Sequence, residues 1–141
     1  ADKLLREAAS RQMVVVDGGP HASQQSLEIA QESRLVVIPT GVTTDDLREA
    51  LKLGAEFVAA GIPRERLAFV LNRTPGSERE IEAARTNIEA FGFWCAAGHI
   101  PLSTGYGSAM DAGLAITETR FRGLNEKAST IIQQLFDRLA A

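Results

Sequence analysis

The chain has 141 residues, of which 45% are hydrophobic and 23% are charged. This length predicts a single domain over residues 1–141, with enough apolar side chains to bury a core. The formal net charge of -3 argues against a wholly basic nucleic-acid binder, although a local basic patch is compatible with it. The single cysteine excludes an internal disulfide and suits a reducing compartment such as the cytoplasm. No apolar run in the sequence approaches the length of a membrane span.

Apolar runs of strand length divide the sequence. They are Met13–Val16, Leu35–Ile38, Leu67–Leu71 and Cys95–Ile100. The runs lack the strict alternation of a strand with one wet face, so we expect strands that are buried on both faces of a sheet. The last run is the weakest strand candidate, because alanine and glycine are poor strand formers.

Amphipathic helical patterns precede, separate and follow these runs. We predict helices over Asp2–Ser10, Ser23–Glu32, Thr44–Ala60, Ser77–Phe91 and Leu124–Leu139. Capping residues support the starts of two of them: Thr43 or Thr44 stands before an acidic first turn, and Ser77 is followed three residues on by Glu80. The alternation of strands and helices predicts an α/β fold of three layers, a parallel sheet with helices on both faces.

The first apolar run leads directly into an aspartate, two glycines and a proline. In an open parallel sheet, ligands bind beyond the carboxyl ends of the strands, where Asp17 is expected. A carboxylate there suits a magnesium ion, and Gly18 and Gly19 would let the backbone approach a phosphate before Pro20 restricts the turn. The alternative is that Asp17 merely caps the turn, since Asp-Gly is a common turn signal.

Several motifs together resemble one protein family, the ParA/MinD P-loop ATPases. "MVVVDGGP" resembles the Walker B strand and switch II of that family, and "RLVVIPTGVTTDDLREAL" resembles its next strand, loop and helix. "AFVLNR" is similar to the strand that ends on an adenine-reading Asn, and "GHIPLSTGYGSAMDAGLAITE" to the IP loop, a small-residue helix and the segment after it. The order and spacing match along almost the whole chain, so the resemblance implies a P-loop NTPase-like sheet.

One part of the family pattern is missing. The sequence contains no G-x-x-x-x-G-K-[ST] phosphate-binding loop, the Walker A motif. In the family, the strand of that loop lies between the Walker B strand and the strand that matches Leu35–Ile38. We therefore expect a gap in the sheet, and infer that the chain is part of a longer protein or that another chain supplies the missing piece. A further departure is Gly19, which replaces a proline and would loosen switch II.

The resemblance also implies the roles of individual residues. Asp17 would be the catalytic residue that holds magnesium through a water molecule, and Gly18, Gly19 and Pro20 would face the γ-phosphate of ATP. The adenine pocket would be formed by Asn72, Arg73, Pro101, Leu102 and Ser103. An Asn amide can donate and accept at once, as adenine requires, and Arg73 could stack on the base. The alternatives stay open: Asn72 as the start of a turn, and Arg73 as a solvated side chain.

The function implied for the intact protein is ATP hydrolysis that switches a homodimer in plasmid or chromosome partitioning, with ATP and magnesium bound and a ParB-like adaptor as partner. Nonspecific DNA contact would involve Arg120, Arg122 and Lys127, although a solvated helix of mixed charge explains them equally well. The main alternative is a noncatalytic interaction or dimerisation module of the same fold. A biosynthetic ligase similar to dethiobiotin synthetase is a third reading, disfavoured because no substrate-carboxylate site is evident. His21 and His99 are too far apart in sequence to suggest a metal pair.

Overall fold

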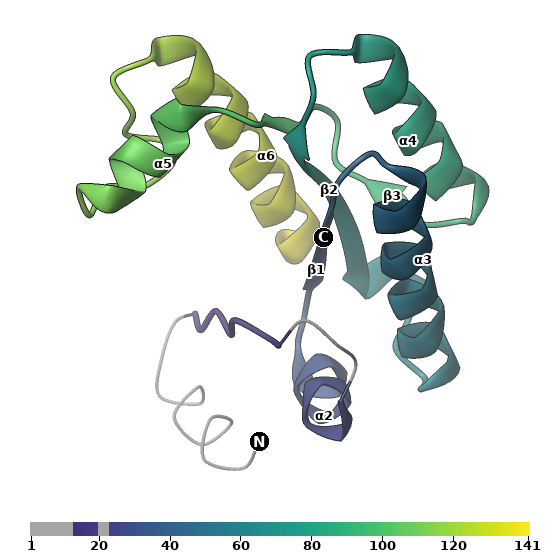
Figure 1. Cartoon of the computed structure of the whole chain (residues 1–141). Coiled ribbons are helices and arrows are strands. Elements are labelled where there is room, and N and C mark those ends of the chain that lie inside the picture. Colours follow the sequence, from purple (N-terminus) through teal and green to yellow (C-terminus); the bar gives the residue numbers. More distant parts are fainter. Residues whose placement is uncertain (1–12, 20–22) are drawn as a thin grey trace.

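A computed structural model describes residues 13–19 and 23–141. Its sheet consists of β1 (Val36–Thr40), β2 (Leu67–Thr74), β3 (Trp94–Cys95) and β4 (Ile100–Pro101). β1 runs parallel to β2, and both short strands also pair with β2 in parallel, β3 near its start and β4 near its end. The expected α/β fold with a parallel sheet is therefore confirmed (Figure 1).

The helices begin close to the positions that their capping residues predict. They are α2 (Gln24–Glu32), α3 (Thr44–Ala59), α4 (Glu78–Ala90), α5 (Thr104–Asp111) and α6 (Arg122–Ala140), with a short 3-10 turn at Arg64–Arg66. The side chains of Ser23, Thr43 and Ser77 each accept the backbone N–H three residues on, which satisfies a donor that the first helical turn leaves free. The helix predicted over 2–10 lies outside the described residues. None of the described helices combines the length and the apolarity needed to cross a membrane.

The two faces of the sheet carry separate apolar clusters, because side chains alternate along each strand. Phe69 and Leu71 of β2 pack with Ile38 of β1 in a cluster that includes the buried sides of α3 and α4. Val70 and Ile100 belong to the other cluster, with α5 and α6. Figure 1 shows α6 on one side of β2, and α3 and α4 on the other. Helices thus cover both faces, as predicted.

The first apolar run, Met13–Val16, is not part of the sheet, so the expectation of a buried strand there is wrong. The segment has no regular secondary structure and its side chains are exposed, with Val15 at 82%. A buried strand needs neighbours for its backbone groups and cover for its side chains. Among the described strands none pairs with Met13–Val16, and β1 has a neighbour along only one of its edges.

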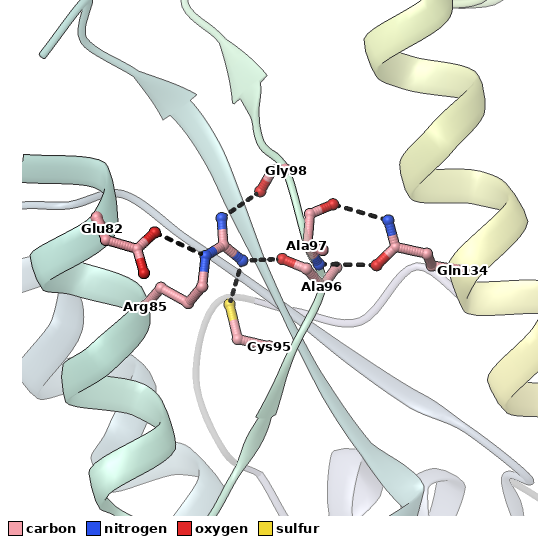
Figure 2. Close-up of polar contacts among 7 residues, drawn as sticks. All are labelled: Glu82, Arg85, Cys95, Ala96, Ala97, Gly98 and Gln134. Atoms are coloured by element: carbon pink, nitrogen blue, oxygen red, sulfur yellow. Dashed lines mark hydrogen bonds and ion pairs between the residues drawn. The ribbon is translucent and has the colours of Figure 1, made fainter. Parts of the chain in front are cut away.

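The last apolar run, Cys95–Ile100, forms two short strands rather than one. β3 ends at Cys95, the N–H of Ala96 still donates to the carbonyl oxygen of Phe69 at 2.9 Å, and residues 97–99 then leave the ladder before β4 starts at Ile100. Gly98 adopts a φ of +98°, a conformation that favours glycine. The interruption is possible because side chains from α4 and α6 bond the peptide groups that no longer pair with β2, as Figure 2 shows.

Candidate functional site: an apolar groove beside Asn72

A groove of about 500 Å³ opens on the α6 side of the sheet, next to the carboxyl ends of β2 and β4. Its apolar lining comes from β1, β2, β4, α5, α6 and the segment before α6, and includes Val37, Val70, Ile100, Ile116, Ile131 and Leu135. The residues of the predicted adenine pocket line the same groove: Asn72, Arg73, Pro101, Leu102 and Ser103. Residues that are about thirty positions apart in the sequence are thus brought together at one site.

Asn72 lies within β2, at a bulge in its pairing with β4, and also lines the groove. Its Oδ1 accepts a hydrogen bond from the backbone N–H of Arg73 at 2.9 Å, and Arg73 has a φ of 53°, which is uncommon for a residue with a side chain. Asn72 thus makes a local backbone contact, but it lies inside β2 and does not begin a turn there. This bond leaves the side-chain amide able to form further hydrogen bonds. The carbonyl oxygen has a second lone pair, and Nδ2 makes no hydrogen bond within the described part of the chain.

The opposite wall of the groove is the segment Pro101–Ser103. Its backbone is fixed by a hydrogen bond of 3.0 Å from the N–H of Leu102 to the carbonyl oxygen of Thr74. The Leu102 side chain is 67% exposed, so it offers apolar surface at the rim. The Ser103 hydroxyl accepts the N–H of Gly105 at 3.2 Å and caps α5. Ser103 therefore shapes the wall by fixing where α5 begins. Serine is a common N-cap residue, so this role is not specific to a binding site.

A relay of polar side chains lies beside this wall. The Nζ of Lys127 is 3.4 Å from Nε2 of His99, and Nδ1 of His99 is 2.6 Å from the hydroxyl oxygen of Thr74. Since an ammonium group only donates, Nε2 must be the acceptor, and the proton lies on Nδ1 and is donated to Thr74. The Thr74 hydroxyl is in turn 3.4 Å from the carbonyl oxygen of Ile100, the first residue of β4.

The electrostatic surroundings favour the neutral form of His99. Partial burial lowers the pKa of His99, the positive charges of Lys127 and Arg85 lower it further, and only Glu78 acts in the opposite direction. The sequence pattern raises His99 only as half of a metal pair with His21, which it disfavours, and it does not predict this relay. No spacing rule could have found it, because Thr74, His99 and Lys127 come from different elements.

The predicted magnesium and phosphate residues do not join this groove. Asp17, Gly18 and Gly19 are exposed and are not among its lining residues, and Pro20 lies outside the described residues. Within residues 13–19 and 23–141, no group of three or more His, Cys, Asp or Glu side chains could hold a metal ion. No carboxylate is among the described residues that line the groove, and the roles of Asp17, Gly18 and Gly19 stay predictions.

The basic residues near the start of α6 are engaged in local contacts. Arg122 is paired with Glu126 at 2.7 Å, and the guanidinium of Arg120 stacks over the ring of Phe121 at 5.0 Å. Lys127 faces His99. These contacts are those of a solvated helix of mixed charge, and DNA contact through this surface stays a prediction.

No protein-family model matches the chain, and no curated protein is significantly similar to it. The likeness to the ParA/MinD family therefore rests on the sequence motifs alone and stays a prediction.

Proposed function

We propose that the groove is an adenine-binding site, and that the chain is a segment of a ParA/MinD-like ATPase. The observation that carries this proposal is the convergence of Asn72, Arg73 and Pro101–Ser103 on one groove. The order of the motifs in the sequence predicts these residues without any structural information. They lie at or just after the carboxyl ends of two parallel strands, which is the edge of an open α/β sheet where ligands bind.

The chemistry of the groove suits a flat base with polar edges. Pro101, Leu102 and Val70 provide apolar surface for the faces of the ring system. The Nδ2 of Asn72 can donate to a ring nitrogen of adenine, and its Oδ1 can accept from the exocyclic amine while keeping the bond from Arg73. A volume of about 500 Å³ lies within the range of sites that hold small ligands.

For the intact protein, the proposal rests only on the resemblance of the sequence motifs to the ParA/MinD family. There we infer binding of ATP and magnesium, hydrolysis controlled mainly by positioning and charge, and a homodimer that acts with a ParB-like adaptor in partitioning. The sequence of this chain contains no phosphate-binding loop. We therefore expect base recognition, but no ATP hydrolysis, from the chain alone.

The test uses adenosine, which needs no phosphate loop. We expect a titration followed by ¹H–¹⁵N NMR to shift the signals of the Asn72 side chain and of the Leu102 amide, with weaker effects from guanosine. Asn72→Asp keeps an acceptor for the N–H of Arg73 but removes the donor, and should weaken adenosine binding by about 1–3 kcal/mol. Asn87→Asp, at an exposed position in α4, is the matched control for the added charge. Unchanged affinity in Asn72→Asp, or no shift in the groove, would refute adenine recognition.

A second candidate, a noncatalytic interaction module, is favoured by a different observation. β1 pairs with β2 along one edge only, and Val37, on the groove side, is 42% exposed. Such an edge invites pairing with another chain. This function predicts that the isolated chain self-associates in analytical ultracentrifugation, and that Val37→Lys reduces the association. A compact monomer that unfolds cooperatively would contradict it.

A further inference from the structure

We propose that Arg85 and Gln134 clamp residues 96–98 from two sides and thereby position the Pro101–Ser103 wall of the groove. The residues concerned lie on α4 and α6, outside the groove lining, and act through the chain between β3 and β4 (Figure 2). The importance of that wall for adenosine rests on the proposed function, whereas the clamp itself is tested independently of any ligand.

Arg85 holds the segment from the α4 side. Its Nη1 bonds the carbonyl oxygen of Ala96 and lies 3.7 Å from the Sγ of Cys95, and its Nη2 donates to the carbonyl oxygen of Gly98 at 2.9 Å. Glu82 contacts Nε at 3.4 Å, and only 13% of the Arg85 side chain is exposed. The planar guanidinium therefore bridges two carbonyl groups on one short segment with a fork that lysine lacks.

Gln134 holds the same segment from the α6 side. Its Oε1 accepts the N–H of Ala97 at 2.7 Å, and its Nε2 donates to the carbonyl oxygen of Ala97 at 2.7 Å. The side-chain amide thus pairs with one residue as a neighbouring strand would. Glutamate at this position would keep the bond to the N–H but lose the bond to the carbonyl oxygen.

The two side chains bond backbone groups of residues 96–98 that make no bond to β2, while the N–H of Ala96 still donates to the carbonyl oxygen of Phe69 at 2.9 Å. β3 pairs with Ala68 and Phe69, and β4 pairs with Asn72 and Thr74, so the segment between them has to leave β2 and return to it. The return is completed by the bond from Leu102 N–H to Thr74. Because the covalent path from Gly98 to Leu102 is short, the position of residues 96–98 limits where the wall can lie.

The helices that carry the clamp have other anchors. α4 buries Ile81, Ala84 and Ile88, and α6 buries Ala128 and Ile131. Apolar burial of this kind should keep both helices in place when a polar clamp residue is replaced. The clamp can therefore be removed while the sheet and its helices remain, which makes its local effect measurable.

The experiment measures amide hydrogen exchange by NMR in the ligand-free chain. In Gln134→Ala and in Arg85→Met, we expect exchange at Leu102 to accelerate at least about tenfold, while the amides of Phe69 and Leu71 change only with global stability. Gln134→Ala should also release the amide of Ala97. Gln133→Ala and Arg48→Met are matched controls, because within the described residues the Gln133 side chain bonds only Asp137 and the Arg48 side chain bonds only Asp45.

The conservative variants separate positioning from folding. Arg85→Lys and Gln134→Glu should give intermediate exchange at Leu102, and they serve as the test if the larger changes prevent folding. Unchanged exchange at Leu102 in these variants, or acceleration that merely follows the loss of global stability, would overturn the proposal. Adenosine affinity is then measured in the same set: failure of the unsubstituted chain to bind it refutes the proposed function, but leaves the exchange result to decide the clamp.

Discussion

The two faces of the sheet differ in how completely they are covered. On the α3 and α4 face, Phe69 and Leu71 have no exposed surface, Ile38 has 3%, and the rings of Phe69 and Phe93 lie 5.0 Å apart. On the α6 face, Val37 is 42% exposed beside a groove of about 500 Å³. The difference teaches that the tightest packing lies on one side of these strands, and the groove for which we propose binding lies on the other.

The largest expected effect comes from removing a side chain on the covered face. Phe69→Ala should lower the free energy of unfolding by about 3–5 kcal/mol, because a fully buried aromatic ring is lost and the packed site collapses only in part. Urea denaturation measures the change. Val37→Ala, on the open face, should cost far less, and similar losses in the two variants would show that the faces do not differ as described.

Two glycines, one on each face of the sheet, allow the same comparison with smaller expected changes in the free energy of unfolding. A Cβ at Gly54 in α3 would lie 2.9 Å from Cζ of Phe69 and 3.1 Å from Cζ of Phe93, whereas a Cβ at Gly107 in α5, on the groove, would meet nothing within 4 Å. Gly54→Ala should therefore destabilise the fold by about 1–3 kcal/mol. Gly107→Ala should be neutral or stabilise it by up to about 1 kcal/mol, through helix propensity. Thermal and urea unfolding of both variants test the pair, and destabilisation by Gly107→Ala would mean that the groove is more tightly packed than its open volume indicates.

The regular elements on both faces of the sheet were predictable from sequence, and the contacts between distant residues were not. Apolar runs and capping residues predicted β1, β2 and the helices because these signals act over a few neighbouring residues. Met13–Val16 has the composition of a buried strand. Burial, however, requires a neighbouring strand, and the residues of the segment itself do not specify one. The break inside Cys95–Ile100 was missed because the side chains that stabilise it, Arg85 and Gln134, are distant in sequence. Motif order located the groove residues, but it did not reveal the relay at His99.

The relay at His99, on the groove side of the sheet, gives the smallest expected effect, a dependence of stability on pH. Burial, together with Lys127 and Arg85, lowers the pKa of His99 in the folded chain below its usual value of about 6.5. Below that pH the unfolded chain binds more protons than the folded chain, so stability falls as the pH drops from about 6.5 toward the folded pKa. At neutral pH and above, both states hold His99 uncharged, and its contribution does not vary. The effect should be modest because water reaches the partly exposed ring.

The measurement compares urea unfolding at pH 7.5 and pH 5.5 for the chain and for His99→Gln, both with His21→Gln so that no other histidine titrates. Carboxylates titrate in both proteins, so their contribution cancels in the difference. We expect acidification to destabilise the chain with His99 more than the variant, since glutamine can still donate to Thr74 and does not gain a proton beside Lys127. An equal loss in both proteins would show that His99 protonates as freely in the fold as outside it. The acceptor role of Nε2 toward Lys127 would then have to be abandoned, and with it the relay to the carbonyl of Ile100 at the edge of the groove.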